Sequence, residues 1–200
     1  MFIIRGIIIW FILSTVINAY LMTLPKPFYK KREYPVSYQI KRKNKIDIQN
    51  KYECAAFSTA YVLRHFGIDA DGFGIYKNFP SKTELGLVYP KGIRTYLKQC
   101  GFKTSYYKGN VDSLKYHVSK GNPVIVFIKT SKNENTLHFV PITGYDKNYF
   151  YIAESLRELI NCSAGKNSYN RKVSIDEFKK IWDIKSLHIP LYSNTYIVVE

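Results

Sequence analysis

An uncharged apolar stretch, residues 6–24, follows Arg5 at the start of the chain. Helical residues rise by about 1.5 Å each, so a helix of this length approaches the ~30 Å thickness of a bilayer's hydrocarbon core. Residues 1–24 are therefore predicted to form a retained transmembrane anchor or a signal peptide cut after Ala19. A third interpretation is a helix buried in the domain. In the first two cases, the rest of the chain must build the fold alone.

A basic segment, residues 25–45, follows the apolar stretch. Residues 26–45 contain eight Lys or Arg and the single acid Glu33, whereas residues 46–200 contain 21 basic and 14 acidic residues. Its prolines and its lack of a helical period predict a linker. One interpretation is a solvated tether, and the other is contact with anionic lipid, worth of order 1 kcal/mol per basic residue. No nucleic-acid-binding motif accompanies the charge, so we expect no such partner.

The apolar stretch and the charge after it also bear on localisation. A retained anchor predicts a membrane protein with a single N-terminal span, whereas a cleaved signal predicts an exported one. Taken alone, the positive-inside rule places the domain in the cytoplasm. The side of the membrane on which the domain lies stays open.

Residues 46–200 have the pattern of one α+β domain, with helices first and an antiparallel sheet after them. Apolar positions at three-to-four spacing predict helices over residues 55–66, 91–100 and 111–119. Continuous or alternating apolar runs predict strands over residues 123–128, 137–145 and 149–153. At 200 residues, the whole chain is long enough for one substantial core and hardly for two.

The cysteines narrow the class of protein. Cys54, Cys100 and Cys162 are too few for a disulfide scaffold and lack the spacing of a zinc site, so we expect no metal and no cofactor. Cys54 stands where the first helix of the domain begins. Free N–H groups and the helix dipole stabilise a thiolate at that position, which makes Cys54 a candidate nucleophile. The alternative is a buried cysteine that acts as a small apolar side chain.

A thiolate nucleophile needs a proton acceptor, and the chain has four histidines. His65 lies on the same predicted helix as Cys54, about 16 Å along its axis, and cannot contact the sulfur. His117 and His188 have no acid at a recognisable spacing, so we interpret both as surface or core histidines. His138 differs because it begins a strand that leads into a predicted hairpin.

Counting along that hairpin pairs His138 with an acid. If the loop has three residues, Tyr145 faces Tyr149, and Glu154 becomes a diagonal neighbour of His138, about 7 to 8 Å away between Cα atoms. Glu154 would then orient the imidazole while the other ring nitrogen faces Cys54. The alternative is a cross-strand polar contact without a catalytic role.

Several segments together resemble the C39-like branch of the papain-like cysteine peptidases: residues 49–67, 120–126, 138–140, 144–146, 151–154 and 173–182. The order Gln, Cys, His, acid matches that family, and the resemblance covers the chain from residue 46 to its end. It implies a papain-like fold and cleavage of a peptide or protein substrate through an acyl-thioester. It further implies that Cys54 is the nucleophile, His138 the general base, Glu154 the orienting acid and Gln49 an oxyanion-hole donor.

The chain departs from the family at a few positions. Glu53 and Ala55 flank the cysteine where members usually have Asp and Gly, and Glu154 replaces an Asp or Asn. Pro141 has no N–H to donate within its strand, which predicts a sheet edge or a bulge. No reacting group is lost. The alternative function is a catalytically silent papain-like module that binds peptides while tethered to the membrane.

Overall fold

The computed structural model describes all residues except 1, 23, 135, 164–167 and 185–191, and along the first helix it describes side chains only for residues 4–17. His188 and the side chain of Ala19 therefore lie outside the described residues. The helices are α1 (Phe2–Met22), α2 (Cys54–His65), α3 (Gly72–Lys77), α4 (Pro90–Gln99), α5 (Val111–Val118) and α6 (Ile175–Trp182), with a 3-10 turn η1 (Arg157–Leu159). The strands are β1 (Lys26–Phe28), β2 (Tyr38–Gln39), β3 (Thr104–Gly109), β4 (Val124–Lys129), β5 (Leu137–Tyr145), β6 (Tyr149–Ile152), β7 (Arg171–Ser174) and β8 (Thr195–Val199).

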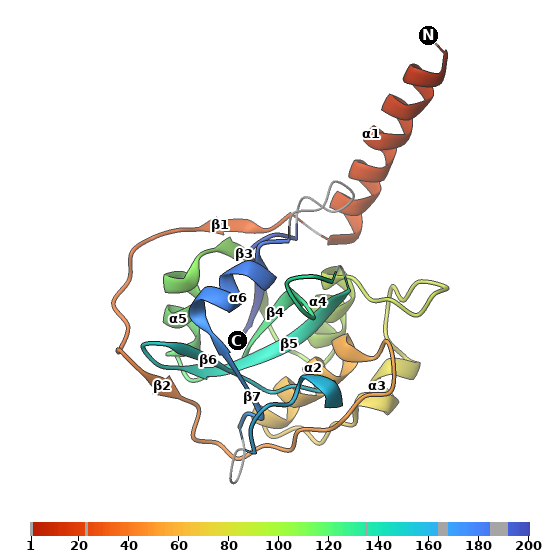
Figure 1. The fold of residues 1–200 in the computed structure, drawn as a ribbon. Coiled ribbons are helices and arrows are strands. Elements are labelled where there is room, and N and C mark those ends of the chain that lie inside the picture. Colours follow the sequence, from red (N-terminus) through yellow and green to blue (C-terminus); the bar gives the residue numbers. More distant parts are fainter. Residues whose placement is uncertain (1, 23, 135, 164–167, 185–191) are drawn as a thin grey trace.

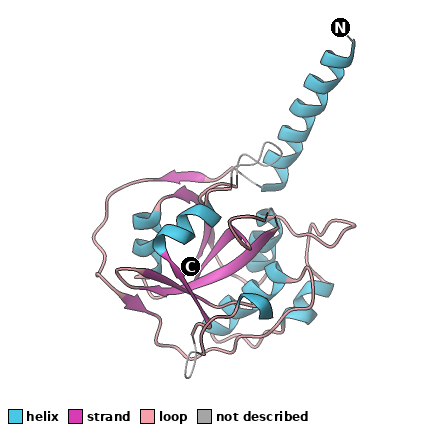
Figure 2. Ribbon diagram, in the orientation of Figure 1, coloured by secondary structure: helices cyan, strands magenta, loops and turns pink. Residues whose placement is uncertain are grey.

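One sheet forms the centre of the domain, in the order β1-β3-β8-β4-β5-β6-β7, with β2 paired to β5 (Figures 1 and 2). Successive residues of a strand face opposite sides, and both sides of β4 are apolar. Ile125 and Phe127 pack with α2, α3 and α4, whereas Val126 and Ile128 pack with α5 and α6. Helices therefore cover both faces of the sheet, which leaves its central strands fully buried.

Helix α2 is buried along almost its whole length and lies beside β5. Small side chains, including Ala55, Ala56 and Ala60, let it approach the sheet closely. The Ser58 hydroxyl donates a 2.9 Å hydrogen bond to the Phe139 carbonyl, which fixes the helix against the strand. This packing holds the first residue of α2 next to the first residues of β5.

The β5–β6 hairpin has a different register from the predicted one near its turn. Tyr145 faces Phe150 instead of Tyr149, and the register shifts between Ile142 and Gly144. Beyond that irregularity, Ile142 faces Ile152, which is the pairing that a three-residue loop predicts. The predicted register is therefore wrong next to the turn but correct at Ile142, on the side of the irregularity that leads to His138.

The irregularity follows directly after Pro141. The expectation of an edge or a bulge is confirmed only for the bulge, because β5 has β4 on one side and β6 on the other. The Pro141 carbonyl still accepts a 3.0 Å hydrogen bond from the Ala153 N–H. Its missing donor is therefore tolerated inside the sheet.

Residues 25–45, here called the strap, pack on the domain. Strand β1 pairs in parallel with β3, and β2 pairs antiparallel with β5. Ile40 is buried, and the Tyr34 hydroxyl donates to the Asp112 carboxylate at 2.5 Å. The interpretation as a solvated tether is therefore wrong, because strand pairing and burial fix this segment even though its Lys and Arg side chains stay exposed.

Helix α1 extends away from the body of the protein (Figure 1). Its apolar side chains are mostly exposed between residues 4 and 17. Among the described residues, no helix has the length and apolar character needed to cross a membrane. The structure thus does not support the transmembrane or signal segment predicted for residues 1–24, and membrane localisation stays a prediction.

Candidate active site

Three of the four predicted site residues meet where α2, β5 and the segment after β6 converge. Cys54 is the first residue of α2, His138 is the second residue of β5, and Glu154 follows the end of β6 by two residues. The imidazole Nε2 lies 2.7 Å from the Glu154 Oε1 atom. The Cys54 side chain hydrogen bonds with the same imidazole. Because Nε2 faces the carboxylate, Nδ1 is the nitrogen left for the sulfur.

Cys54 is half-buried, and its position follows from the local sequence. The preceding residue, Glu53, caps the helix without a side-chain hydrogen bond to it. Its carboxylate instead accepts from the Lys51 N–H at 2.7 Å, which closes a tight turn before the helix. The Ala56 and Phe57 N–H groups donate to the Glu53 carbonyl at 2.9 and 3.0 Å, so Cys54 stands in the first turn of the helix, where the helix dipole favours negative charge.

His138 is 2% exposed. Burial lowers the pKa of its imidazole, but the charge of Glu154 and the hydrogen bonds with Cys54 and Glu154 outweigh burial and raise that pKa to about 10. The site therefore favours a protonated His138 at neutral pH. An imidazolium in contact with a cysteine stabilises the thiolate form of that cysteine.

The Glu154 carboxylate is completely buried and accepts three hydrogen bonds. Oε1 accepts from the His138 Nε2–H and from the Leu156 N–H at 2.8 Å, and Oε2 accepts from the Arg171 Nη1–H at 2.8 Å. Burial raises the pKa of Glu154, but the two cations and the backbone donor lower it to about 2. Glu154 is therefore ionised in the folded protein.

Gln49, the fourth predicted residue, is also buried and is linked to the segment that carries Glu154. Its Oε1 atom accepts from the Ser155 hydroxyl at 2.7 Å, and its backbone N–H donates to the Ser155 carbonyl at 2.9 Å. Its Nε2 group donates to the Lys51 carbonyl at 2.8 Å. Since an amide nitrogen carries two hydrogens, a second donor remains for a ligand.

Sequence reasoning missed three residues that support this arrangement. Arg171 binds the Glu154 carboxylate, Ser155 binds Gln49, and Asn170 holds the backbone of Glu154 from both sides. The Asn170 Oδ1 atom accepts from the Glu154 N–H at 2.7 Å, and its Nδ2 group donates to the Glu154 carbonyl at 2.9 Å. No motif marks these residues. A prediction that β7 pairs with β6 would have brought residues 170–171 beside Glu154.

The remaining histidines and cysteines lie elsewhere. His65 contacts Asn122 at 3.3 Å, and His117 packs among aromatic rings. Cys100 and Cys162 are free, and burial raises the pKa of both thiols. Within the described part of the chain, no group of three or more His, Cys, Asp or Glu side chains could hold a metal ion.

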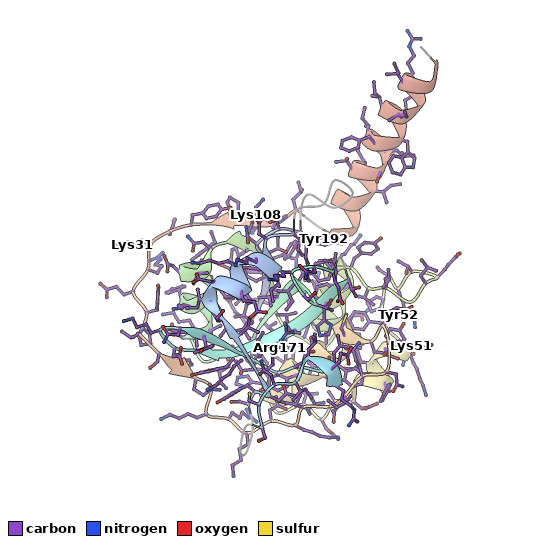
Figure 3. The ribbon with its side chains drawn as sticks, in the orientation of Figure 1. Lys31, Lys51, Tyr52, Lys108, Arg171 and Tyr192 are labelled. Carbon is purple, nitrogen blue, oxygen red and sulfur yellow. The ribbon has the colours of Figure 1, made fainter. Side chains whose placement is uncertain are left out.

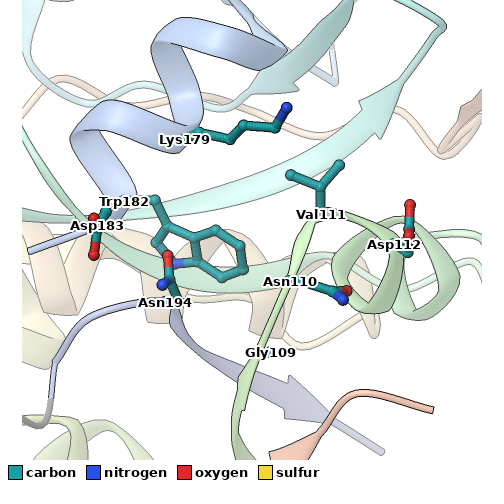
Figure 4. A pocket seen from close by; sticks show the side chains of 8 residues that line it. All are labelled: Gly109, Asn110, Val111, Asp112, Lys179, Trp182, Asp183 and Asn194. Carbon is teal, nitrogen blue, oxygen red and sulfur yellow. The ribbon is translucent and has the colours of Figure 1, made fainter. Parts of the chain in front are cut away.

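A pocket of about 510 Å³ opens between the start of α5 and the end of α6 (Figure 4). It is lined by Gly109, Asn110, Val111, Asp112, Lys179, Trp182, Asp183 and Asn194. None of the four predicted site residues contributes to this lining. The pocket is therefore separate from the contacts among Cys54, His138 and Glu154.

A comparison with models of protein families shows to which family this chain belongs. The model of the Peptidase_C39 like family matches residues 31–186. The chain belongs to this family. The resemblance found in the sequence is thereby confirmed, and the match also includes part of the strap. A comparison with curated proteins gives no match.

Solved structures similar to this member of the Peptidase_C39 like family show the same fold. The peptidase domain of Streptococcus ComA, a bi-functional ABC transporter involved in quorum sensing, has a TM-score of 0.59 and 16% identity, over 79% of this chain and 98% of that one. A double glycine motif protease from an AMS/PCAT transporter, solved with its leader peptide, has a TM-score of 0.53 and 15% identity, over 80% and 96%. Xylellain, a cysteine protease from Xylella fastidiosa, has a TM-score of 0.56 and 11% identity, over 89% and 91%. The predicted α+β papain-like fold is confirmed, but the sheet is mixed and not antiparallel throughout, because β1 pairs in parallel with β3.

Proposed function

We propose that this C39-like protein is an active cysteine peptidase that cleaves a peptide bond through Cys54, His138 and Glu154. The observation that carries the proposal is the unbroken series of contacts from the Cys54 thiol through the His138 imidazole to the buried Glu154 carboxylate. A nucleophile, a base in contact with it and a third group that orients the base are the parts that nucleophilic catalysis requires.

The reaction would proceed in two halves. The Cys54 thiolate attacks the peptide carbonyl carbon, and the C–N bond breaks as the His138 imidazolium gives its proton to the leaving amine. A water molecule then attacks the resulting thioester and loses its proton to His138. The C–S bond breaks, which restores the thiolate and the imidazolium. Glu154 keeps its charge throughout and holds the ring by accepting from Nε2.

Both halves pass through a tetrahedral oxyanion, for which Gln49 is the proposed side-chain donor. Its carboxamide is held at Oε1 by Ser155 and at Nε2 by the Lys51 carbonyl, so its second N–H has a fixed direction. The backbone N–H of Cys54 would be the other donor. A preorganised donor of this kind contributes about 3 kcal/mol to stabilisation of the transition state.

The proposed substrate is a peptide or protein segment, in keeping with the leader peptide bound to the double glycine motif protease. Exposed apolar side chains near the start of α2 support this choice. Leu85 and Leu87 flank Gly86, whose carbonyl accepts from the hydroxyl of Tyr76. The Gly86 backbone lies near the ring of Tyr52, two residues before Cys54. Burial raises the pKa of Tyr76, and the charges of Glu53 and Cys54 add to that effect. Apolar peptide side chains would bind there.

A peptide carrying a thiol-directed electrophile tests the proposal. We expect it to label Cys54 alone, as read by mass spectrometry, and to block turnover of a mixed peptide library by the purified protein. Cys54→Ala should bind peptides without cleaving them. If the wild-type protein also binds peptides without labelling or turnover, the silent peptide-binding module is the better description.

The exposed basic side chains of the strap favour anionic lipid as a second partner. Lys30, Lys31 and Arg32 are exposed on its outer side, and Lys31 lies at the edge of the molecule (Figure 3). We expect the protein to sediment with vesicles that contain anionic lipid and to be released by salt. Replacing these three residues by Gln should weaken that binding without changing the alkylation of Cys54. Equal binding to neutral vesicles would contradict lipid recognition through charge.

A further inference from the structure

Arg171 is a buried cation in direct contact with the candidate active site. It is 5% exposed and is the first residue of β7, the last strand in the order of the sheet (labelled in Figure 3). Its Nη1 group donates to the Glu154 Oε2 atom at 2.8 Å, and its Nη2 group donates to the Thr130 carbonyl at 3.4 Å. One guanidinium therefore links the acid to the end of β4, next to the strand that carries His138.

The two oxygens of Glu154 have separate partners. Oε1 faces His138 and Leu156, whereas the side-chain donor to Oε2 is Arg171. A glutamate has one more rotatable bond than an aspartate, so a Glu in this position has more ways to turn away from the imidazole. The fixed donor on Oε2 removes that freedom. A guanidinium suits this task because its donors form a rigid planar fork.

The same contact settles the charge of the site. A buried carboxylate without a counter-ion is strongly disfavoured. With Arg171 present, the charges of Glu154 and the guanidinium cancel, so the buried carboxylate is compensated whichever member of the Cys54–His138 pair holds the proton. The orienting acid is thus held in position and electrically compensated by a residue that reaches no substrate.

We infer that Arg171 is a positioning residue of the active site, which aims the Glu154 carboxylate at His138 and thereby supports the reactive Cys54–His138 pair. This inference rests on the proposed function, because it assigns Arg171 a role in that active site. Its test does not need peptide turnover, because the alkylation rate of Cys54 by a small neutral reagent such as iodoacetamide already reports that pair.

The experiment is a double-mutant cycle on that rate, near pH 6. Arg171→Met, Glu154→Gln and the double variant are compared with the wild-type protein. We expect Arg171→Met to slow alkylation about tenfold in the wild-type background and to change it less than about twofold in the Glu154→Gln background. Lys172→Met, an exposed neighbour on the same strand, should have no effect in either background.

Equal losses in both backgrounds would mean that Arg171 has only a structural role, and no loss in the wild-type background would also overturn the inference. Removing one member of a buried ion pair is strongly destabilising. If circular dichroism shows that Arg171→Met is unfolded, Arg171→Lys replaces it, because lysine keeps the charge but lacks the fork. A wild-type rate for Arg171→Lys would then overturn the inference. If the cycle is non-additive but no peptide is cleaved, the proposed function fails and the positioning role stands.

Discussion

Two histidines in different regions of the molecule show what makes one of them chemically useful. His117, on α5, packs against the rings of Phe28, Tyr107 and Tyr196. Its Nε2 atom is buried without a hydrogen-bond partner among the described residues. Burial, with a smaller contribution from Lys120, lowers its pKa to about 4. His138 is more deeply buried, yet its pKa is raised to about 10.

The difference lies in the neighbours and not in burial. The aromatic rings around His117 include no counter-ion and no hydrogen-bond acceptor for its Nε2 atom among the described residues, so desolvation dominates and the lowered pKa keeps the imidazole neutral. Glu154 stabilises the charged form of His138, and it remains ionised because His138 first, and then Arg171 and the Leu156 N–H, lower its pKa. The proposed catalytic histidine thus differs from His117 in facing a buried acid that has its own counter-ion.

The largest effect on peptide turnover is expected for a substitution of His138, compared with a substitution of His117. His138→Ala should lower peptide turnover by on the order of 10⁵-fold, because both proton transfers pass through this imidazole. His117→Phe should leave turnover within about twofold, since a ring of similar shape replaces one that titrates outside the working range. Steady-state kinetics on a cleavable peptide measures both. Comparable losses in the two variants would show that the contrast between the regions is not functional.

A smaller effect on peptide turnover is expected for substitution of the orienting acid, Glu154. Glu154→Gln should lower turnover by about 10³-fold, less than loss of the nucleophile, because the orienting acid of a triad contributes less. Asp146→Asn is the matched control. The Asp146 carboxylate accepts from the Asn148 and Tyr149 N–H groups and from a tyrosine hydroxyl, so it serves the hairpin turn. If Asp146→Asn lost turnover and Glu154→Gln kept it, the assignment of the acid would be wrong.

The next largest effect is expected for substitution of Gln49, the proposed oxyanion-hole donor. Gln49→Ala should lower kcat by about 10²-fold with little change in KM, because the donor acts on the transition state. Ser155→Ala should lower kcat about tenfold, since the Gln49 carboxamide loses the hydroxyl that fixes its orientation. Ser155→Thr keeps the hydroxyl and should restore most of the rate. Unchanged kcat in Gln49→Ala would exclude this side chain from the oxyanion hole.

The sequence predicted those parts of the fold whose signals are local. The helix that begins at Cys54 has apolar residues at helical spacing, the long strand that contains His138 is a mostly apolar run, and both are present. The turn register was wrong because the bulge after Pro141 depends on how three strands pack, and strand counting assumes a regular ladder. The strap was missed because β1 and β2 are too short to show a period of their own.

For the candidate site, too, the sequence indicated some residues and missed others. Type and spacing made Cys54, His138 and Glu154 candidates, and the family resemblance implied their roles and added Gln49. Their supports could not be selected in this way, because Arg171 and Ser155 reach the site only through pairing of β6 with β7 and through the contact with Gln49. A buried arginine has the same sequence signature as an exposed one. The role of Arg171 can be inferred only from a structure that shows its contact with the Glu154 carboxylate.

The smallest expected effect concerns stability. His117 has a folded-state pKa of about 4, below its ordinary value of about 6.5, so the unfolded chain binds its proton first as the pH falls. The stability associated with neutral His117 is complete above about pH 6.5 and is lost as the pH falls through about 4. For His138 the sign is opposite, because its raised pKa gives stability that is lost as the pH rises towards about 10.

His117→Phe should therefore flatten the acid side of the stability profile and leave the alkaline side unchanged. The measurement is the thermal unfolding midpoint at about pH 7.5 and about pH 5, where the wild-type midpoint should fall by a few degrees more than that of the variant. His65, whose pKa is also lowered by burial, is present in both proteins and cancels in the comparison. Glu154, with a pKa of about 2, begins to lose its contribution only at lower pH. An identical acid-side fall in the two proteins would mean that His117 is solvated well enough to be protonated without cost, and the contrast with His138 would then lie in the acid alone.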